Sequence, residues 1–225
     1  DTREDLHFRV DLEEPEALEG IRRRTIDYES NTKAIVRDYR DAPGLWLSPW
    51  DDQNDTGRAP LLIYSAIKKD AEERIRPVLE EEFGEGKVET YTGDTNESKR
   101  DRLRIRFKTN KMDAMVATAA FGMGIDKPDV RFVAHLNLPK SLESSYQETG
   151  RAGRDGLKST AWLAYGLEDV SKIMNFIVSS NASEDQKRIE KQKLDALLGF
   201  CETTRCRRQV LLEYFGENLP HPCGN

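Results

Sequence analysis

The sequence predicts an α/β protein: a doubly wound, mainly parallel sheet with helices on both faces, followed by a small α-rich appendage. Between residues 61 and 180, short apolar runs alternate with longer amphipathic stretches, which is the pattern of repeated strand–helix units. The connections between them are short, so successive strands should pair in parallel. From residue 181 onward, helical patterns continue without any strand between them.

Residues 1–60 are predicted to form an entry strand, polar helices and a loop. The run at 6–10 alternates apolar and polar side chains, as a short strand does. Residues 15–39 indicate one or two polar helices with a thin apolar stripe, and residues 42–60 are rich in Pro, Gly and Asp, which favour a loop.

Residues 61–180 are predicted to form the main domain. Strands are expected at 61–64, 87–91, 114–117, 131–136 and 161–165, and helices at 69–83, 96–107, 141–148 and 167–179. Pro77 should kink the first of these helices. Ligands of doubly wound sheets bind beyond the carboxyl ends of the strands. Thr118 and the loop at 121–126 directly follow the third of these strands, so they should lie at the functional edge.

Residues 181–225 are predicted to form the appendage, with helices at 183–200 and 206–215 and a closing loop. All three cysteines of the chain, which are too few for a disulfide scaffold, lie in its last 25 residues. Their clustering therefore calls for a reason other than disulfide bonding.

Composition places the chain among soluble globular proteins. Charged residues make up 34% and hydrophobic residues 37%, and no apolar run approaches the roughly 20 residues of a membrane span. We therefore expect no membrane partner and an intracellular location, cytoplasmic in a bacterium or nuclear in a eukaryote. The first residue is Asp1 rather than Met, which suggests a piece of a longer protein.

The net charge of the chain gives only weak information about its binding partners. The net charge of −6 disfavours a general nucleic-acid binder, but residues 98–111 hold seven basic side chains against one acidic side chain. This basic stripe suits either nucleic-acid contact or an ordinary solvated helix face.

Two arginines three residues apart, Arg151 and Arg154, lie among small residues in a loop, which suits contact with a phosphate. The phosphate-cradling pattern Gly-x4-Gly-Lys-Ser/Thr is absent from the sequence, as is an Asp-Glu-x-Asp/His metal-binding run. The chain thus lacks the groups that hold a nucleoside triphosphate and its magnesium ion. The two arginines could complete such a site only if another domain supplied the rest.

The pattern Gln147-x-x-Gly-Arg151-x-x-Arg154 resembles motif VI of the two-lobed superfamily 2 helicases. The longer runs at 117–133 and 146–156 resemble the RecQ family in particular, and the runs at 206–217 and 222–225 resemble the start of that family's zinc-binding module. The resemblance implies a RecA-like lobe.

The resemblance also implies a role for each matching residue. Arg151 and Arg154 would face ATP as arginine fingers. Gln147, Gly124 and Asp126 would lie near the nucleotide. The positions implied to contact DNA are Thr118, Tyr64 and Ser65.

Other interpretations of single residues stay open. Asp126 could cap a turn, Arg154 could pair with Asp155, and His135 on its core strand suits a buried structural role. Thr92 departs from the family's Tyr-His-Gly sequence, and residues 66–68 depart from the small polar and basic residues usual there.

The cysteines carry a further implication of the resemblance. Cys206 and Cys223 match the first two of four zinc ligands, and the other two would follow residue 225. Two ligands alone should hold zinc poorly. We therefore expect no stoichiometric zinc in this chain, and we expect Cys201 to be a buried thiol.

The resemblance therefore implies the C-terminal lobe of an ATP-dependent 3′–5′ DNA helicase. ATP and Mg²⁺ would be held mainly by an N-terminal RecA-like lobe, zinc would belong to the full-length protein, and single-stranded or duplex DNA would be the partner. Alone, the chain should be an inactive monomer. The alternative is a degenerate lobe that acts as a non-catalytic DNA-binding or docking module.

Overall fold

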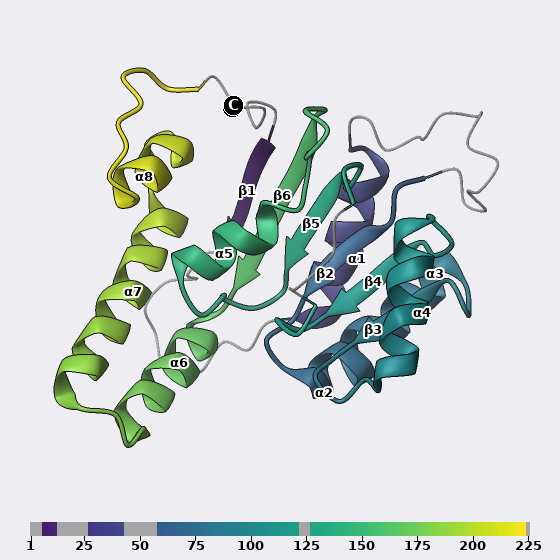
Figure 1. Cartoon of the computed structure of the whole chain (residues 1–225), viewed down its shortest axis with the longest axis horizontal. Helices are drawn as coiled ribbons and strands as arrows, with labels where there is room; N and C mark the ends of the chain where they lie inside the picture. Colours follow the sequence, from purple (N-terminus) through teal and green to yellow (C-terminus); the bar gives the residue numbers. More distant parts are fainter. Residues whose placement is uncertain (1–5, 13–26, 43–57, 122–126, 224–225) are drawn as a thin grey trace.

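The computed structural model describes residues 6–12, 27–42, 58–121 and 127–223. Within them, six strands form one parallel sheet in the order β1-β6-β5-β2-β4-β3 (Figure 1). The strands are β1 (Leu6–Leu12), β2 (Leu61–Tyr64), β3 (Val88–Tyr91), β4 (Ala114–Ala117), β5 (Phe132–His135) and β6 (Ser159–Tyr165). This confirms the predicted α/β class.

The strand expected near the N-terminus lies at one edge of the sheet. It pairs with β6 over its whole length, from Leu6 opposite Ser159 to Leu12 opposite Tyr165. The first segment of the chain therefore belongs to the same sheet as the main domain.

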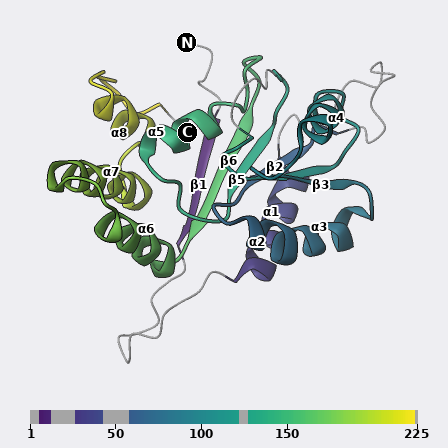
Figure 2. The same ribbon diagram turned by 60° about the horizontal axis from the view of Figure 1, so that its bottom comes forward.

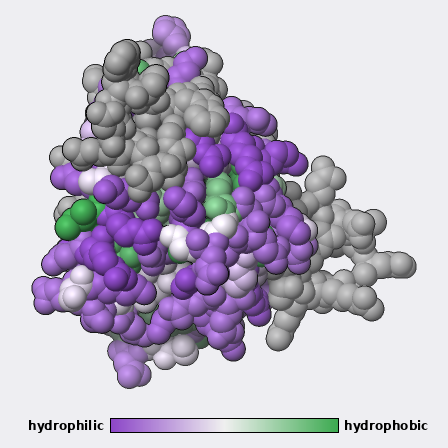
Figure 3. All heavy atoms as spheres, turned by 90° about the vertical axis from the view of Figure 1, so that its right-hand side faces the viewer, coloured by the Kyte–Doolittle hydropathy of each residue, from purple (hydrophilic) through white to green (hydrophobic). Residues whose placement is uncertain are grey.

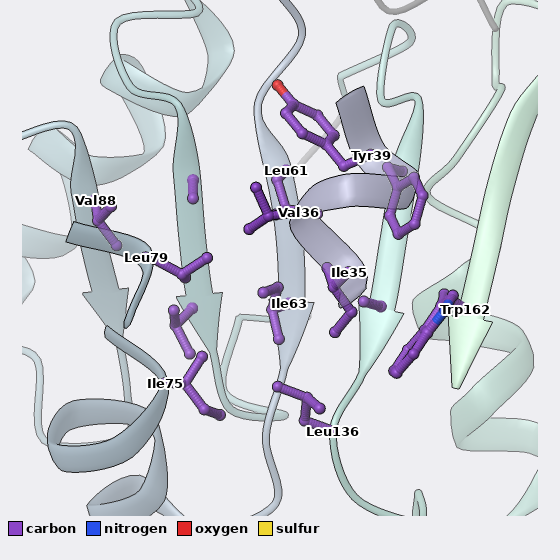
Figure 4. Close-up of a cluster of buried hydrophobic side chains, with 14 of the residues drawn as sticks. Ile35, Val36, Tyr39, Leu61, Ile63, Ile75, Leu79, Val88, Leu136 and Trp162 are labelled. Carbon is purple, nitrogen blue, oxygen red and sulfur yellow. The ribbon is translucent and has the colours of Figure 1, made fainter. Parts of the chain in front are cut away.

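Helices cover both faces of the sheet (Figure 2). The helices α1 (Tyr28–Arg40) and α3 (Arg76–Phe83) lie on one face, while α4 (Glu97–Lys108) and α5 (Leu142–Thr149) lie on the other. Alternate residues of β2 are buried on opposite faces, as the pleat requires. Figure 4 shows the first face, where the apolar core includes Ile35, Val36, Leu61, Ile63, Ile75, Leu79 and Trp162.

The helix expected at 69–83 is divided around Pro77. A short α-helical turn, α2 (Lys68–Asp70), leads into a π-helical turn, η1 (Ala71–Ile75), and α3 follows. Proline has no N–H, and its ring clashes with the carbonyl four residues earlier. Widening the preceding turn accommodates the ring, so the predicted kink takes the form of a π-helical turn.

The C-terminal helices form one apolar cluster with α5. They are α6 (Leu167–Ser179), α7 (Glu184–Glu202) and α8 (Arg207–Tyr214). Leu142 of α5 is buried with Leu194 and Leu197 of α7 and with Leu211 of α8. The α-rich end of the chain is therefore packed against the helix that leads into the arginine-bearing loop.

The face that carries α3 and α4 is mostly hydrophilic (Figure 3). None of the described helices is long and apolar enough to cross a membrane. The expected helix at 15–39 begins at residue 28 in the structure; residues 15–26 and most of the 42–60 loop lie outside the described ranges.

Candidate nucleotide and nucleic-acid interface

A hollow of about 180 Å³ opens at the carboxyl ends of three adjacent strands. Its walls come from the ends of β2, β4 and β5 and from α5. It is lined by Tyr64, Ser65, Ala66, Thr118, Ala119, Ala120, His135, Asn137, Leu138, Pro139, Lys140, Ser144 and Glu148. The structure thus places Thr118 at the predicted edge, where it is partly exposed.

Tyr64 and Ser65 form part of the wall, and both are buried. Tyr64 is 3% exposed, and its hydroxyl donates to the carbonyl of Phe121 at 3.1 Å. Burial raises the pKa of the Tyr64 phenol, and the charge and hydrogen bond of the Arg151 guanidinium offset part of that rise. Tyr64 therefore lies between the loop after β4 and the arginine-bearing loop.

His135 links the hollow to α5. Its imidazole stacks on the Tyr64 ring, with centroids 5.2 Å apart and planes 16° apart. Its Nε2 lies 2.7 Å from Oε2 of Glu148 on α5. The predicted burial of His135 is confirmed, but its place beside the candidate site was not predicted.

Asn137, in the wall of the hollow, forms hydrogen bonds with three separate segments of the chain. Its Oδ1 accepts the backbone N–H of Ala66 at 3.1 Å, and its Nδ2 donates to the Tyr28 hydroxyl at 2.9 Å and to Asp169 at 3.1 Å. Burial raises the pKa of the Asp169 carboxyl. We did not predict these hydrogen bonds of Asn137 from the sequence. The one indication that the sequence offers is a polar residue just after a buried strand.

The arginine-bearing loop joins α5 to β6. Arg151 is buried, while Gln147 and Arg154 are exposed. The Arg154 Nε donates to the carbonyl of Gly150 at 3.3 Å. One buried and one exposed arginine thus flank the same tight turn.

Gly153 makes that turn possible. It has a φ of +64°, and a Cβ at this position would lie 2.9 Å from the Leu157 carbonyl and 2.6 Å from Ser159 Oγ. A side chain here would be strained and would also clash.

Asp155 pairs with Arg131, which is buried, through two hydrogen bonds. The open alternative was a pair between Arg154 and Asp155. The structure instead joins Asp155 to the start of β5, across the turn.

Gly124 and Asp126, the other residues expected near the nucleotide, lie outside the described residues. The described residues resume at Lys127. Its buried Nζ lies 2.7 Å from Oδ1 of Asp129.

Three of the seven basic residues in the stripe at 98–111 have a structural role. Arg100 donates to the carbonyl of Gly93, Arg104 donates to the Tyr91 hydroxyl at 3.1 Å, and Arg106 pairs with Glu89. These arginines of α4 hold the edge strand β3 and the turn that follows it. The interpretation as an ordinary helix face is therefore closer to the structure than a dedicated nucleic-acid surface.

The two cysteines that match zinc ligands of the family lie side by side. The Sγ atoms of Cys206 and Cys223 are 3.4 Å apart, near the roughly 3.8 Å that two thiolates on a tetrahedral zinc would show. Partial burial raises the pKa of the Cys206 thiol, but backbone hydrogen bonds, foremost from Cys223, lower it overall. The two thiols fit half of a zinc site. Among the described residues, no group of three or more His, Cys, Asp and Glu side chains could hold a metal ion.

Cys201 differs from the other two cysteines. It is 1% exposed, and burial raises the pKa of its thiol to about 12. The prediction of a buried thiol is confirmed.

Two protein-family models match the chain. Residues 48–156 match the helicase conserved C-terminal domain, and residues 167–225 match the RecQ zinc-binding family.

Curated relatives agree with both matches. The chain is 36% identical over 163 residues to the ATP-dependent DNA helicase RecQ of Bacillus subtilis, covering 72% of this chain and 27% of that protein. It is 48% identical over 126 residues to the protein of the same name from Haemophilus influenzae, covering 56% of this chain and 20% of that protein. The chain therefore spans about a quarter or less of these relatives.

Solved structures support the fold. The helicase MrfA bound to DNA matches with a TM-score of 0.54 at 16% identity, over 93% of this chain and 30% of that one. Dbp5 of S. cerevisiae, bound to RNA and ADP BeF3, matches with a TM-score of 0.51 at 19% identity, over 87% of this chain and 46% of that one. These neighbours make the fold that of a RecA-like helicase domain. The two family matches and the curated relatives place the chain in the RecQ helicase family, as a C-terminal helicase region followed by zinc-binding sequence.

Proposed function

We propose that this chain is the C-terminal lobe of an ATP-dependent 3′–5′ DNA helicase. In this proposal, an N-terminal lobe holds most of ATP and Mg²⁺, and this lobe supplies Arg151 and Arg154 across the cleft. The same lobe grips the backbone of single-stranded DNA at the hollow. Alone, the chain is a monomer that neither hydrolyses ATP nor unwinds DNA.

The observation that carries the proposal is the position of Tyr64. Its hydroxyl bonds the Phe121 carbonyl and faces the guanidinium of Arg151, while its ring lines the hollow. One side chain thus contacts the loop after β4, the arginine-bearing loop and the proposed DNA site. These contacts suit a lobe in which the binding of nucleotide and the binding of DNA affect each other.

The chemistry asked of the arginines is electrostatic. A transferring phosphoryl group spreads negative charge over its oxygens, and an arginine finger that stabilises this charge is worth about 10³–10⁵ in rate. A guanidinium fixed in advance, as the buried Arg151 is, needs little reorganisation when the charge develops. Arg154 lies exposed on the same turn.

The hollow supports contact with a DNA backbone. Thr118 offers a hydroxyl at its mouth, and Lys140 is exposed at its rim. A hydroxyl and an ammonium group suit phosphate oxygens and do not read sequence. Binding should therefore tolerate many sequences and weaken with salt.

In the full-length protein, Cys206 and Cys223 would supply two thiolates to a structural zinc ion. Such an ion, when bound, cross-links the segments that carry its ligands. Here it would tie the segment after α8 to the start of that helix.

Alanine substitution of each arginine tests the proposal. The chain is assembled with its N-terminal lobe, and ATP turnover is measured with saturating oligodeoxythymidylate. We expect Arg151→Ala to lower turnover by about 10³ or more, and Arg154→Ala to lower it as well. Arg151→Lys should also be slow, because lysine keeps the charge but loses the planar fork.

Lys158→Ala is the matched control, because Lys158 is an exposed basic residue of the same segment. It should turn over ATP at the wild-type rate. If Arg151→Ala and Arg154→Ala both leave turnover unchanged, the finger assignment is wrong. If wild type itself shows no DNA-stimulated hydrolysis, the alternative of a non-catalytic DNA-binding or docking module is favoured.

A further inference from the structure

We infer that His135 is a positioning residue for Arg151. It would hold the guanidinium in place through Tyr64 on one side and Glu148 on the other. This inference rests on the proposed function, because Arg151 matters to turnover only if it acts on ATP.

The contacts of His135 lead to Arg151 by two routes. Through its ring it stacks on Tyr64, whose hydroxyl oxygen faces the Arg151 guanidinium. Through Nε2 it meets the carboxylate of Glu148 at 2.7 Å. Glu148 lies one helical turn before Arg151, and its carbonyl accepts the Arg151 backbone N–H at 3.3 Å.

A histidine is an unexpected choice at this position for packing alone. The three residues before it on β5 are Phe, Val and Ala, and His135 is only 2% exposed. A buried polar group costs free energy unless it is hydrogen-bonded, whereas phenylalanine would fill the space without that cost. The bond to Glu148 offsets the cost, and it is a bond from the sheet to the last turn of α5.

Fixing that turn matters because Arg151 follows it directly. The helix ends at Thr149, so the loop with Arg151 leaves from the turn that Glu148 belongs to. A misplacement of about 1 Å in a catalytic group can cost about 10²-fold in rate. Freeing Tyr64 and Glu148 together should therefore slow the chemical step more than it weakens binding.

The test compares variants of His135 in the two-lobe helicase. His135→Phe keeps a ring to stack on Tyr64 but loses the bond to Glu148. We expect its kcat with saturating DNA to fall about 10-fold to 100-fold, while KM for ATP and the affinity for oligodeoxythymidylate stay within about twofold. His135→Gln keeps an N–H donor and should recover part of the loss.

Two further variants separate positioning from packing. Val133→Ala, two residues earlier on the same face of β5, removes core volume without touching the bond, and it should keep the wild-type kcat. Glu148→Ala removes the bond from the other side. It should reproduce the His135→Phe loss, and the double variant should be no slower than either single one, because both act through one contact.

A wild-type kcat in His135→Phe would overturn the inference, whatever the result for Glu148→Ala. So would a loss of DNA affinity in His135→Phe as large as that of Thr118→Ala, because His135 would then act as a wall of the DNA site. If Arg151→Ala is slow while His135→Phe is normal, the inference alone falls. If Arg151→Ala is itself normal, the proposed function falls first.

Discussion

The ion pair between Arg131 and Asp155 stabilises the turn that carries the two proposed arginine fingers, Arg151 and Arg154. Arg131 is 3% exposed, so its charge depends on a partner for compensation. Removing the partner of a buried charge leaves that charge uncompensated, which costs more than the pair itself contributes. The carboxylate of Asp155 should therefore be important for the shape of this loop.

Substitution of Asp155 by Asn should lower the free energy of unfolding by about 2 kcal/mol at pH 7. Partial burial raises the pKa of Asp155, but its hydrogen bonds to Arg131 and the Leu157 N–H lower it below its ordinary 3.8 overall. A lowered carboxyl pKa contributes stability above the unfolded-state pKa, and this contribution is lost as pH falls through the folded-state value. Urea unfolding of both proteins should show a gap at pH 7 that closes below about pH 4; a gap independent of pH would contradict this account.

For single residues, the sequence indicated which residues belong to the site better than it indicated which residues they contact. Glycines and arginines in a short loop indicated a phosphate site, and the positive φ of Gly153 agrees with the need for glycine there. The partner of Asp155 could not be predicted, because Arg131 lies 24 residues away, directly before β5. The local sequence offered only the neighbour Arg154, as an open alternative.

At the scale of elements, helix starts were predictable because their caps are local. Ser141 accepts the N–H of Ser144 at the start of α5, and Ser183 accepts that of Gln186 at the start of α7. The π-helical turn before Pro77 was not predictable, because the sequence indicates that a proline disturbs a helix but not how the backbone responds.

Helix α7 should stabilise the C-terminal part of the protein through its packing against α5. Leu197 is fully buried in the cluster shared by α5, α7 and α8. Substitution by Ala should lower the free energy of unfolding by about 2–5 kcal/mol, as expected for a buried leucine. Ile189→Ala, on the same helix but 41% exposed, is the control and should change it by less than about 1 kcal/mol.

Denaturant midpoints followed by circular dichroism would measure both variants. Equal midpoints for Leu197→Ala and Ile189→Ala would contradict the packing of α7 on α5 described above.

At the scale of the whole molecule, the hollow could not be located from sequence. Its walls come from β2, β4, β5 and α5, and it exists because β2 lies between β4 and β5. Strand–helix alternation predicts a parallel sheet but not the order of its strands. The position of Thr118 at the functional edge was nevertheless predictable, because it follows a strand directly.

Lys140 at the rim of the hollow should contribute to DNA binding. Lys140→Ala should weaken binding of this chain to oligodeoxythymidylate and reduce the slope of log K against log salt by about 0.7, the value for one phosphate contact on a single strand. Fluorescence anisotropy across a salt series would measure it. Lys111→Ala, also exposed but just before the amino end of β4, should leave the slope unchanged; the opposite ranking would place DNA elsewhere on the molecule.

In our proposal, this lobe completes an ATP site that another lobe must hold. Measuring DNA-stimulated ATP turnover for this chain, for its N-terminal lobe, and for the two together tests this division of the site. We expect no turnover by this chain, little by the N-terminal lobe, and a rise of about 10³ or more on mixing that the Arg151→Ala chain does not give. Turnover by this chain alone, or a mixture no faster than the N-terminal lobe, would contradict it.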